Sequence, residues 1–165
     1  MLNTFPQPHG HSGDQTVAAR DLFHDIVKKA LQNEGWTITH DPYALSADSF
    51  DLAIDLGAEK IIAAQRGETK IAVEIKSFLG PSKITEFYGA MGQFIAYRTA
   101  LHKQDPQRIL YLAVPENLYD KFFATSFLQE LIQQNHLYLI TYDIEQEAIT
   151  QWTPELSTEI ISKNS

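Results

Sequence analysis

Cysteine is absent from the chain of 165 residues. Disulfide bonds and metal sites built from thiolates are therefore excluded. The sequence also lacks any apolar run close to the ~20 residues that a membrane-spanning helix needs. Its first residues, MLNTFPQPHGHSGD, contain no apolar segment of the kind found in a secretory signal peptide. We therefore expect a cytoplasmic protein without membrane contact.

Positive charge is scarce in this chain. Lysine and arginine number 13 against 21 aspartates and glutamates, which gives a formal net charge of -8. This balance argues against a protein that coats nucleic acid through bulk electrostatics, because phosphate binding needs many cations. The charge is unevenly distributed, since residues 60–108 carry a net +4 while each flanking segment carries a net -6. A local basic face is therefore compatible with the negative total.

The composition predicts one globular domain between two tails. Hydrophobic residues make up 44% of the sequence, which is ordinary for a single domain of this length. Residues 1–13 are rich in proline and glycine and poor in apolar side chains, so we expect a disordered N-terminal tail there. The domain is expected to cover residues 14–153, and residues 154–165 are expected to form a C-terminal tail.

The spacing of apolar residues predicts a series of alternating helices and strands. The expected helices cover residues 15–34, 82–103 and 118–134. The expected strands cover residues 36–40, 51–56, 60–65, 70–76, 108–114, 137–142 and 148–152. The expected core stripe of the second helix consists of Ile84, Phe87, Tyr88, Met91, Phe94 and Ile95. This order indicates an α/β domain with a mixed central sheet flanked by helices.

The stretch VEIKSF, residues 73–78, places a carboxylate and an ammonium group two residues apart in an apolar strand. Side chains alternate along a strand, so Glu74 and Lys76 share one face while their apolar neighbours pack on the other. Such a pair can hold a divalent cation and orient an attacking water, but a second carboxylate is needed. Asp55, at the end of the apolar strand expected over residues 51–56, is the candidate for this second carboxylate. A plain hairpin would instead place Glu74 opposite Lys60, which makes Glu59 the alternative.

Each of these residues also has an ordinary interpretation. Glu-x-Lys spacing arises by chance in about every second or third chain of this size. The pair would then be a solvated ion pair on an edge strand, worth ~0–1 kcal/mol. Gln93, on the following helix, would be a surface amide unless its face turns toward the strand. The polar stripe of Asp21, His24 and Lys28 is typical of a solvated helix face, although it could flank an active site.

Several long segments closely resemble the XisH family of cyanobacterial factors that control excision of the fdxN element. They are DLFHDIVKKAL, GWTITHDPY, IDLGAEKIIAA, IAVEIKSFLG, SKITEFYGAMGQFIAYR, RILYLAVPE and YDIEQEAITQW. The resemblance covers about residues 18–152. It implies a restriction-endonuclease-like PD-(D/E)xK core, with Asp55 and Glu74 as ligands of Mg²⁺ or Mn²⁺, Lys76 as the catalytic lysine and Gln93 facing the site. Ile54 stands where that superfamily often has proline, which leaves the identity of the acidic partner open.

The resemblance also implies partners, namely DNA, the small protein XisI and a site-specific recombinase. Two hypotheses follow from it. The chain is either a metal-dependent endonuclease that supports excision, or a non-catalytic regulator that binds XisI or the recombinase. The intact acidic and lysine positions favour the first, and the net charge of -8 favours the second.

Overall fold

The computed structural model describes residues 12–48, 50–51 and 61–156. The helical segments are α1 (Ser12–Asn33), α2 (Lys83–Gln104), α3 (Glu116–Leu118), the π-helical turn η1 (Tyr119–Phe123) and α4 (Ser126–Gln134). The strands are β1 (Thr37–His40), β2 (Ser46–Ala47), β3 (Phe50–Asp51), β4 (Ile61–Arg66), β5 (Thr69–Ile75), β6 (Arg108–Pro115), β7 (Leu139–Asp143) and β8 (Ala148–Thr153). Most of each predicted tail lies outside the described residues.

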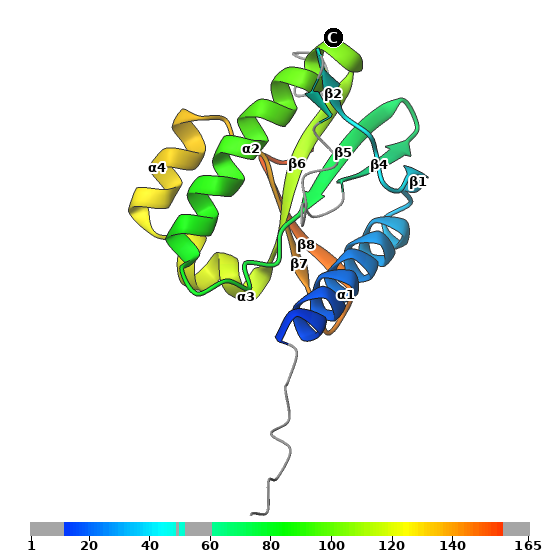
Figure 1. The fold of residues 1–165 in the computed structure, drawn as a ribbon. Coiled ribbons are helices and arrows are strands. Elements are labelled where there is room, and N and C mark those ends of the chain that lie inside the picture. The colour runs from blue at the N-terminus through cyan, green and yellow to red at the C-terminus, as the bar shows by residue number, and fades with distance from the viewer. Residues whose placement is uncertain (1–11, 49, 52–60, 157–165) are drawn as a thin grey trace, which may run out of the picture.

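The main sheet has six strands in the order β1-β4-β5-β6-β7-β8 (Figure 1). Strand β6 runs parallel to both β5 and β7, whereas the remaining neighbours are antiparallel. Because β5 and β6 are parallel, they need a crossover, and α2 provides it. The predicted mixed sheet flanked by helices is therefore confirmed. No helix in the described part of the chain is long and apolar enough to cross a bilayer.

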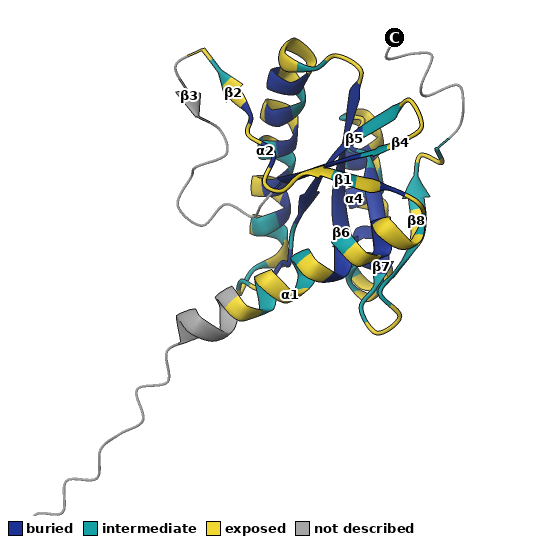
Figure 2. Cartoon of the chain, turned by 90° about the vertical axis from the view of Figure 1, so that its right-hand side faces the viewer, coloured by how far each residue is buried: buried dark blue, intermediate teal, exposed yellow. Residues whose placement is uncertain are grey.

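Alternation along the central strands divides the core into two layers. On one face, Ala72 and its neighbours on β6 pack with α2 and α4; on the other, Ile71, Val73 and Ile75 pack with α1. Figure 2 shows β5 and β6 in the buried colour while the outer side of α1 is exposed. A strand covered on both faces carries an almost continuous apolar run, which is why the segment 108–114 was predictable.

The β4–β5 hairpin and the start of α2 follow local sequence signals. Gly67 has a φ of 60°, which a two-residue turn favours, and Arg66 pairs with Thr69 across it. The side chain of Ser82 accepts a hydrogen bond from the Thr85 N–H and thereby caps α2. The turn at Gly67 thus determines where β5 begins, and the Ser82 cap determines where α2 begins after it.

The predicted continuous helix over residues 118–134 is wrong. The chain forms α3, the turn η1 and α4 instead, and the break falls at Ala124 and Thr125. The Ala124 N–H donates to the Tyr119 carbonyl, and the Thr125 hydroxyl donates to the Phe122 carbonyl. A threonine side chain that takes a backbone carbonyl competes with the helical ladder. After the break Phe127 is 54% exposed.

The predicted core stripe of α2 is partly wrong. Tyr88 and Ile95 are 49% and 38% exposed, while Ala90 and Tyr97 are buried. The buried stripe of α2 consists of Phe87, Ala90, Phe94, Tyr97, Ala100 and Leu101. Both stripes have helical spacing, so periodicity alone could not choose between them.

The predicted strand over residues 51–56 is described only at its start. Phe50 and Asp51 form β3, which pairs with β2 in a separate two-stranded sheet. The rest of that segment lies outside the described residues, and so do Asp55 and Glu59.

The polar stripe of α1 binds the loop after β1 rather than water alone. Asp41 lies 2.8 Å from Nε2 of His24 and 2.7 Å from Nζ of Lys28. Burial on its own would raise the pKa of Asp41, but the hydrogen bonds and charges of Lys28 and His24 outweigh it and hold that pKa below its ordinary value. The cluster therefore fastens α1 to the edge of the sheet.

Replacing Asp41 with asparagine is expected to lower the free energy of unfolding near pH 6 by ~1 kcal/mol. Because its folded pKa is depressed, the contribution is complete above the ordinary value of 3.8 and is lost as pH falls through the folded value. Urea unfolding of wild type and Asp41→Asn between pH 7 and 3 measures the difference, with the exposed Asp21→Asn as control. A difference independent of pH would contradict the assignment.

Candidate functional site

Glu74 lies at the centre of the sheet and not on its edge. Its strand, β5, pairs with both β4 and β6, where Ile61 and Leu112 are its neighbours. The residue is only 1% exposed. The alternative of a solvated edge-strand pair is therefore wrong. A buried carboxylate is costly unless positive charge and hydrogen bonds compensate it, so its surroundings have to supply both.

Lys76 follows β5 directly and connects the buried carboxylate with solvent. Its backbone N–H donates to the Ala113 carbonyl at 3.2 Å, which continues the pairing with β6 past the strand end. Its Nζ lies 3.6 Å from Oε1 of Glu74, and its side chain is 19% exposed. An ammonium has three donors, so the pairing leaves donors for a further acceptor. The predicted sharing of one face by Glu74 and Lys76 thus takes the form of a partly buried ion pair.

A cavity of about 180 Å³ opens beside Lys76. It is lined by Arg20, Lys76, Phe78, Glu86, Gly89, Ala90 and Gln93. Three segments far apart in sequence contribute: α1, the connection from β5 to α2, and the first half of α2. The structure therefore brings the predicted residues Lys76 and Gln93 to one cavity.

The loop between β5 and α2 is held tightly at the mouth of this cavity. Phe78 has a φ of 51°, a left-handed conformation that is uncommon for a residue with a bulky side chain. Its ring packs edge-on against Phe123 at 5.3 Å between centroids, and its carbonyl accepts a hydrogen bond from Nζ of Lys83. Non-glycine residues keep such a conformation only when their surroundings enforce it. The loop therefore gives Lys76 a fixed position.

Two oxygen atoms at the cavity suit a hard cation. Oε1 of Gln93 and Oε2 of Glu86 are buried, and neither has a hydrogen-bond partner among the described residues. Carboxylate and amide oxygens are the donors that Mg²⁺ and Mn²⁺ prefer in proteins. No group of three or more histidine, aspartate or glutamate side chains arranged for a metal occurs within the described ranges. Asp55 and Glu59 lie outside those ranges, so each stays a prediction for the second carboxylate.

Arg20 and Glu86 were missed by the reading of the sequence. Glu86 precedes Gln93 by seven residues, which is two helical turns, so the spacing predicts that both lie on one face of α2 but does not assign Glu86 to the site. Arg20 lies on α1, and only the packing of α1 across the sheet brings it to the cavity. No local signal in the sequence reports that approach.

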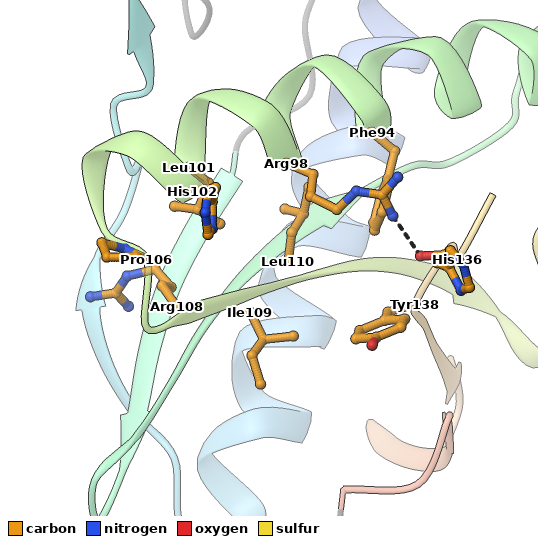
Figure 3. A pocket seen from close by; sticks show the side chains of 10 residues that line it. All are labelled: Phe94, Arg98, Leu101, His102, Pro106, Arg108, Ile109, Leu110, His136 and Tyr138. Atoms are coloured by element: carbon orange, nitrogen blue, oxygen red, sulfur yellow. Dashed lines mark hydrogen bonds between the residues drawn. The ribbon is translucent and has the colours of Figure 1, made fainter. Parts of the chain in front are cut away.

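A second cavity, of about 270 Å³, lies at the other end of α2 (Figure 3). Its basic side chains already have structural partners. Nη1 of Arg98 donates to the carbonyls of Asn135 and His136 at 3.0 and 2.7 Å, which closes the end of α4. Nη1 of Arg108 donates to the Ile71 carbonyl at 3.0 Å. These cations hold chain ends in place, so we assign the candidate site to the cavity beside Lys76.

Comparisons with known proteins agree on one family. The profile described as "XisH protein" matches residues 17–150. A crystal structure of an XisH family protein from Nostoc punctiforme is 49% identical, covers 80% of this chain and 98% of its own, and superposes with a TM-score of 0.74. A crystal structure of a fdxN element excision controlling factor protein from Anabaena variabilis is 50% identical, with the same coverage and TM-score. Comparison with curated proteins gave no match.

Proposed function

The chain belongs to the XisH family, and from this membership we propose that it is an excision controlling factor that supports removal of a DNA element. The name of the Anabaena relative supports this role, since half of its aligned residues are identical. The proposal extends to a restriction-endonuclease-like PD-(D/E)xK core. An antiparallel hairpin, β4–β5, followed by α2 and the parallel strand β6, supports that core.

The activity that we propose is metal-dependent hydrolysis of a DNA phosphodiester. The observation that carries it is the buried carboxylate of Glu74 paired with Lys76 beside an open cavity. A role in stability alone is a weak explanation for such a buried ion pair, because an apolar pair of similar volume is often equally stable. Here the lysine reaches the cavity, where a substrate could meet it.

Each residue of the site would have a distinct role in this hydrolysis. A divalent cation held by Glu74 and by Asp55 or Glu59 would acidify a water molecule and stabilise charge on the phosphate. Lys76 would orient the attacking water and donate a hydrogen bond to a phosphate oxygen. The amide of Gln93 would hold the substrate or the water from the α2 side.

The location of positive charge supports a nucleic-acid substrate. Arg20 and Lys76 line the same cavity, and residues 60–108 carry a net +4 within a chain of net -8. Such a local concentration attracts a phosphate backbone to one place while the acidic remainder repels it. We therefore expect contact over a short length of DNA and a correspondingly weak dependence of binding on salt.

Purified protein is expected to nick supercoiled plasmid DNA in the presence of Mg²⁺ or Mn²⁺ and to stop when EDTA removes the cation. The reason is that a bound cation lowers the pKa of its water ligand and stabilises charge on the phosphate, and neither effect remains once the cation is removed. Gel electrophoresis of the plasmid over time measures the conversion. Intact plasmid at all cation concentrations, with a folded protein, would contradict the enzymatic proposal.

A non-catalytic regulator is the second candidate function. The exposed apolar side chains Tyr88 and Ile95 on α2, together with the overall negative charge, favour a protein partner such as XisI or the recombinase. In that case the plasmid assay would show no cleavage, and a pull-down would retain the partner in stoichiometric amount.

A further inference from the structure

Glu86 has one carboxylate oxygen in use and one without a hydrogen-bond partner among the described residues. Its Oε1 accepts a hydrogen bond from the Gly80 N–H at 2.9 Å. Its Oε2 is buried and accepts no hydrogen bond from the part of the chain that the structure describes. The residue also lines the cavity beside Lys76. The Glu86 carboxylate is therefore held in one orientation, and its Oε2 is the atom that a positive charge could stabilise.

The contact with Gly80 determines where the second oxygen can go. A Cβ atom at position 80 would lie 2.8 Å from Oε1 of Glu86, so a larger residue there would require the carboxylate to shift. The hydrogen bond holds the carboxylate at the start of α2, in its first turn. Because the side chain is braced at one oxygen, the other has little freedom to turn away and find water.

A buried carboxylate oxygen without a partner is expensive. The penalty for a buried acceptor left unsatisfied is ~1–3 kcal/mol and is larger for a charged group. Native proteins keep few such atoms, and a bound ion is one of their common explanations. Gln93, two helical turns further along α2, lines the same cavity, and its Oε1 is also buried without a hydrogen-bond partner among the described residues. Glu86 and Gln93 thus line one small cavity, and each keeps a buried oxygen that a shared cation could satisfy.

We propose that Glu86 is a further ligand of the divalent cation, supplied from α2, with the amide oxygen of Gln93 beside it. The inference rests on the proposed function, because the same cation would contact the β5 carboxylate of Glu74. Helix α2 would then bind the cation directly, in addition to contacting the substrate or the water. Hard cations such as Mg²⁺ and Mn²⁺ take oxygen ligands of this type.

The competing explanation is that Glu86 only braces the loop through Gly80. Two variants separate the two roles. Glu86→Gln keeps an oxygen that can accept the Gly80 hydrogen bond but removes the charge that a cation needs, whereas Glu86→Ala removes both. The matched control is Glu130→Gln on α4, since Glu130 is exposed and loses the same charge.

Titration calorimetry with MnCl₂ in the absence of DNA tests the proposal. We expect Glu86→Gln to weaken Mn²⁺ binding at least about tenfold, the scale on which even the partners of metal ligands act. We expect Glu130→Gln to bind as wild type does. The Mn²⁺-induced rise in melting temperature should shrink in parallel in both Glu86 variants.

The outcomes distinguish this inference from the function on which it rests. Unchanged Mn²⁺ affinity in Glu86→Gln, together with a loss in Glu74→Gln, would overturn the role of Glu86 and leave the nuclease proposal intact. Absence of Mn²⁺ binding by wild-type protein would overturn both. Weakened binding in Glu86→Gln with an unchanged melting temperature in the absence of metal supports the inference, because the loop is then still braced.

Discussion

Replacement of Lys76 by alanine is expected to reduce Mg²⁺-dependent nicking of supercoiled DNA by about 100-fold to 10,000-fold, the usual contribution of a positioned proton-transfer group. The ammonium of Lys76 lies 3.6 Å from Oε1 of the Glu74 carboxylate. It also lines the cavity in which a phosphate would lie. Without it, water would lose its orienting donor, and the phosphate would lose a hydrogen bond.

Glu74→Gln is the companion variant, since it keeps the shape of the side chain and removes the charge. A similar loss of cleavage is expected, because a neutral amide binds a divalent cation poorly. Lys121→Ala on the surface turn η1 serves as control and should cleave as wild type does. Equal cleavage by wild type, Lys76→Ala and Glu74→Gln would identify a contaminating nuclease.

The stability of these variants has to be measured alongside. Lys76→Ala leaves Glu74 buried without its lysine, and breaking a buried pair in this way costs about 3–5 kcal/mol. Lys76→Arg keeps the positive charge and should preserve the fold. If it nevertheless loses cleavage, the ammonium itself takes part in the reaction, because a guanidinium is planar and does not release a proton.

Arg108→Ala is expected to lower the free energy of unfolding by about 3–5 kcal/mol, a large share of the 5–15 kcal/mol typical of a domain. The side chain of Arg108 is 5% exposed, and its Nε lies 3.0 Å from Oδ2 of Asp105. Its guanidinium also bonds the Ile71 carbonyl and lies 5.0 Å from the ring centre of Tyr43. One side chain thus joins the end of α2, strand β5 and the loop that contains Tyr43.

Chemical unfolding of Arg108→Ala against Lys103→Ala measures this effect. Lys103 is exposed in the last turn of α2, so its loss should change stability by less than about 0.5 kcal/mol. Arg108→Lys should fall between the two, because lysine keeps the charge but cannot serve carboxylate, carbonyl and ring together. A loss below about 1 kcal/mol in Arg108→Ala would mean that water replaces its partners.

Much of the fold could be predicted because its signals are local. The turn at Gly67 and the apolar run after Arg108 each depend on neighbouring residues, and both were placed within about a residue or two. The hairpin register differs slightly, since Glu74 pairs with Ile61 and not with the adjacent position 60. The break between Phe122 and Ser126 could not be predicted, because it depends on which hydrogen bond the Thr125 hydroxyl forms.

The candidate site was predictable in part for the same reason. Glu74 and Lys76 share a face because strands alternate, which is a property of local geometry. The approach of Gln93 depends on how α2 rotates against the sheet, and periodicity permitted two rotations. The approach of Arg20 could not be predicted, since it lies on α1 and meets the side chains of α2 only in the folded molecule. Asp55 and Glu59 stay predictions.

The position of β6 beside β5 has a consequence for synthesis on the ribosome. Every residue assigned to the site precedes Phe94, yet β5 obtains its second neighbour only when β6 (Arg108–Pro115) has been made. Until then the nascent chain holds the charged end of β5 with one open backbone edge, which is prone to wrong pairing. A ribosome stalled before β6 would therefore hold all of these side chains without the sheet that orients them.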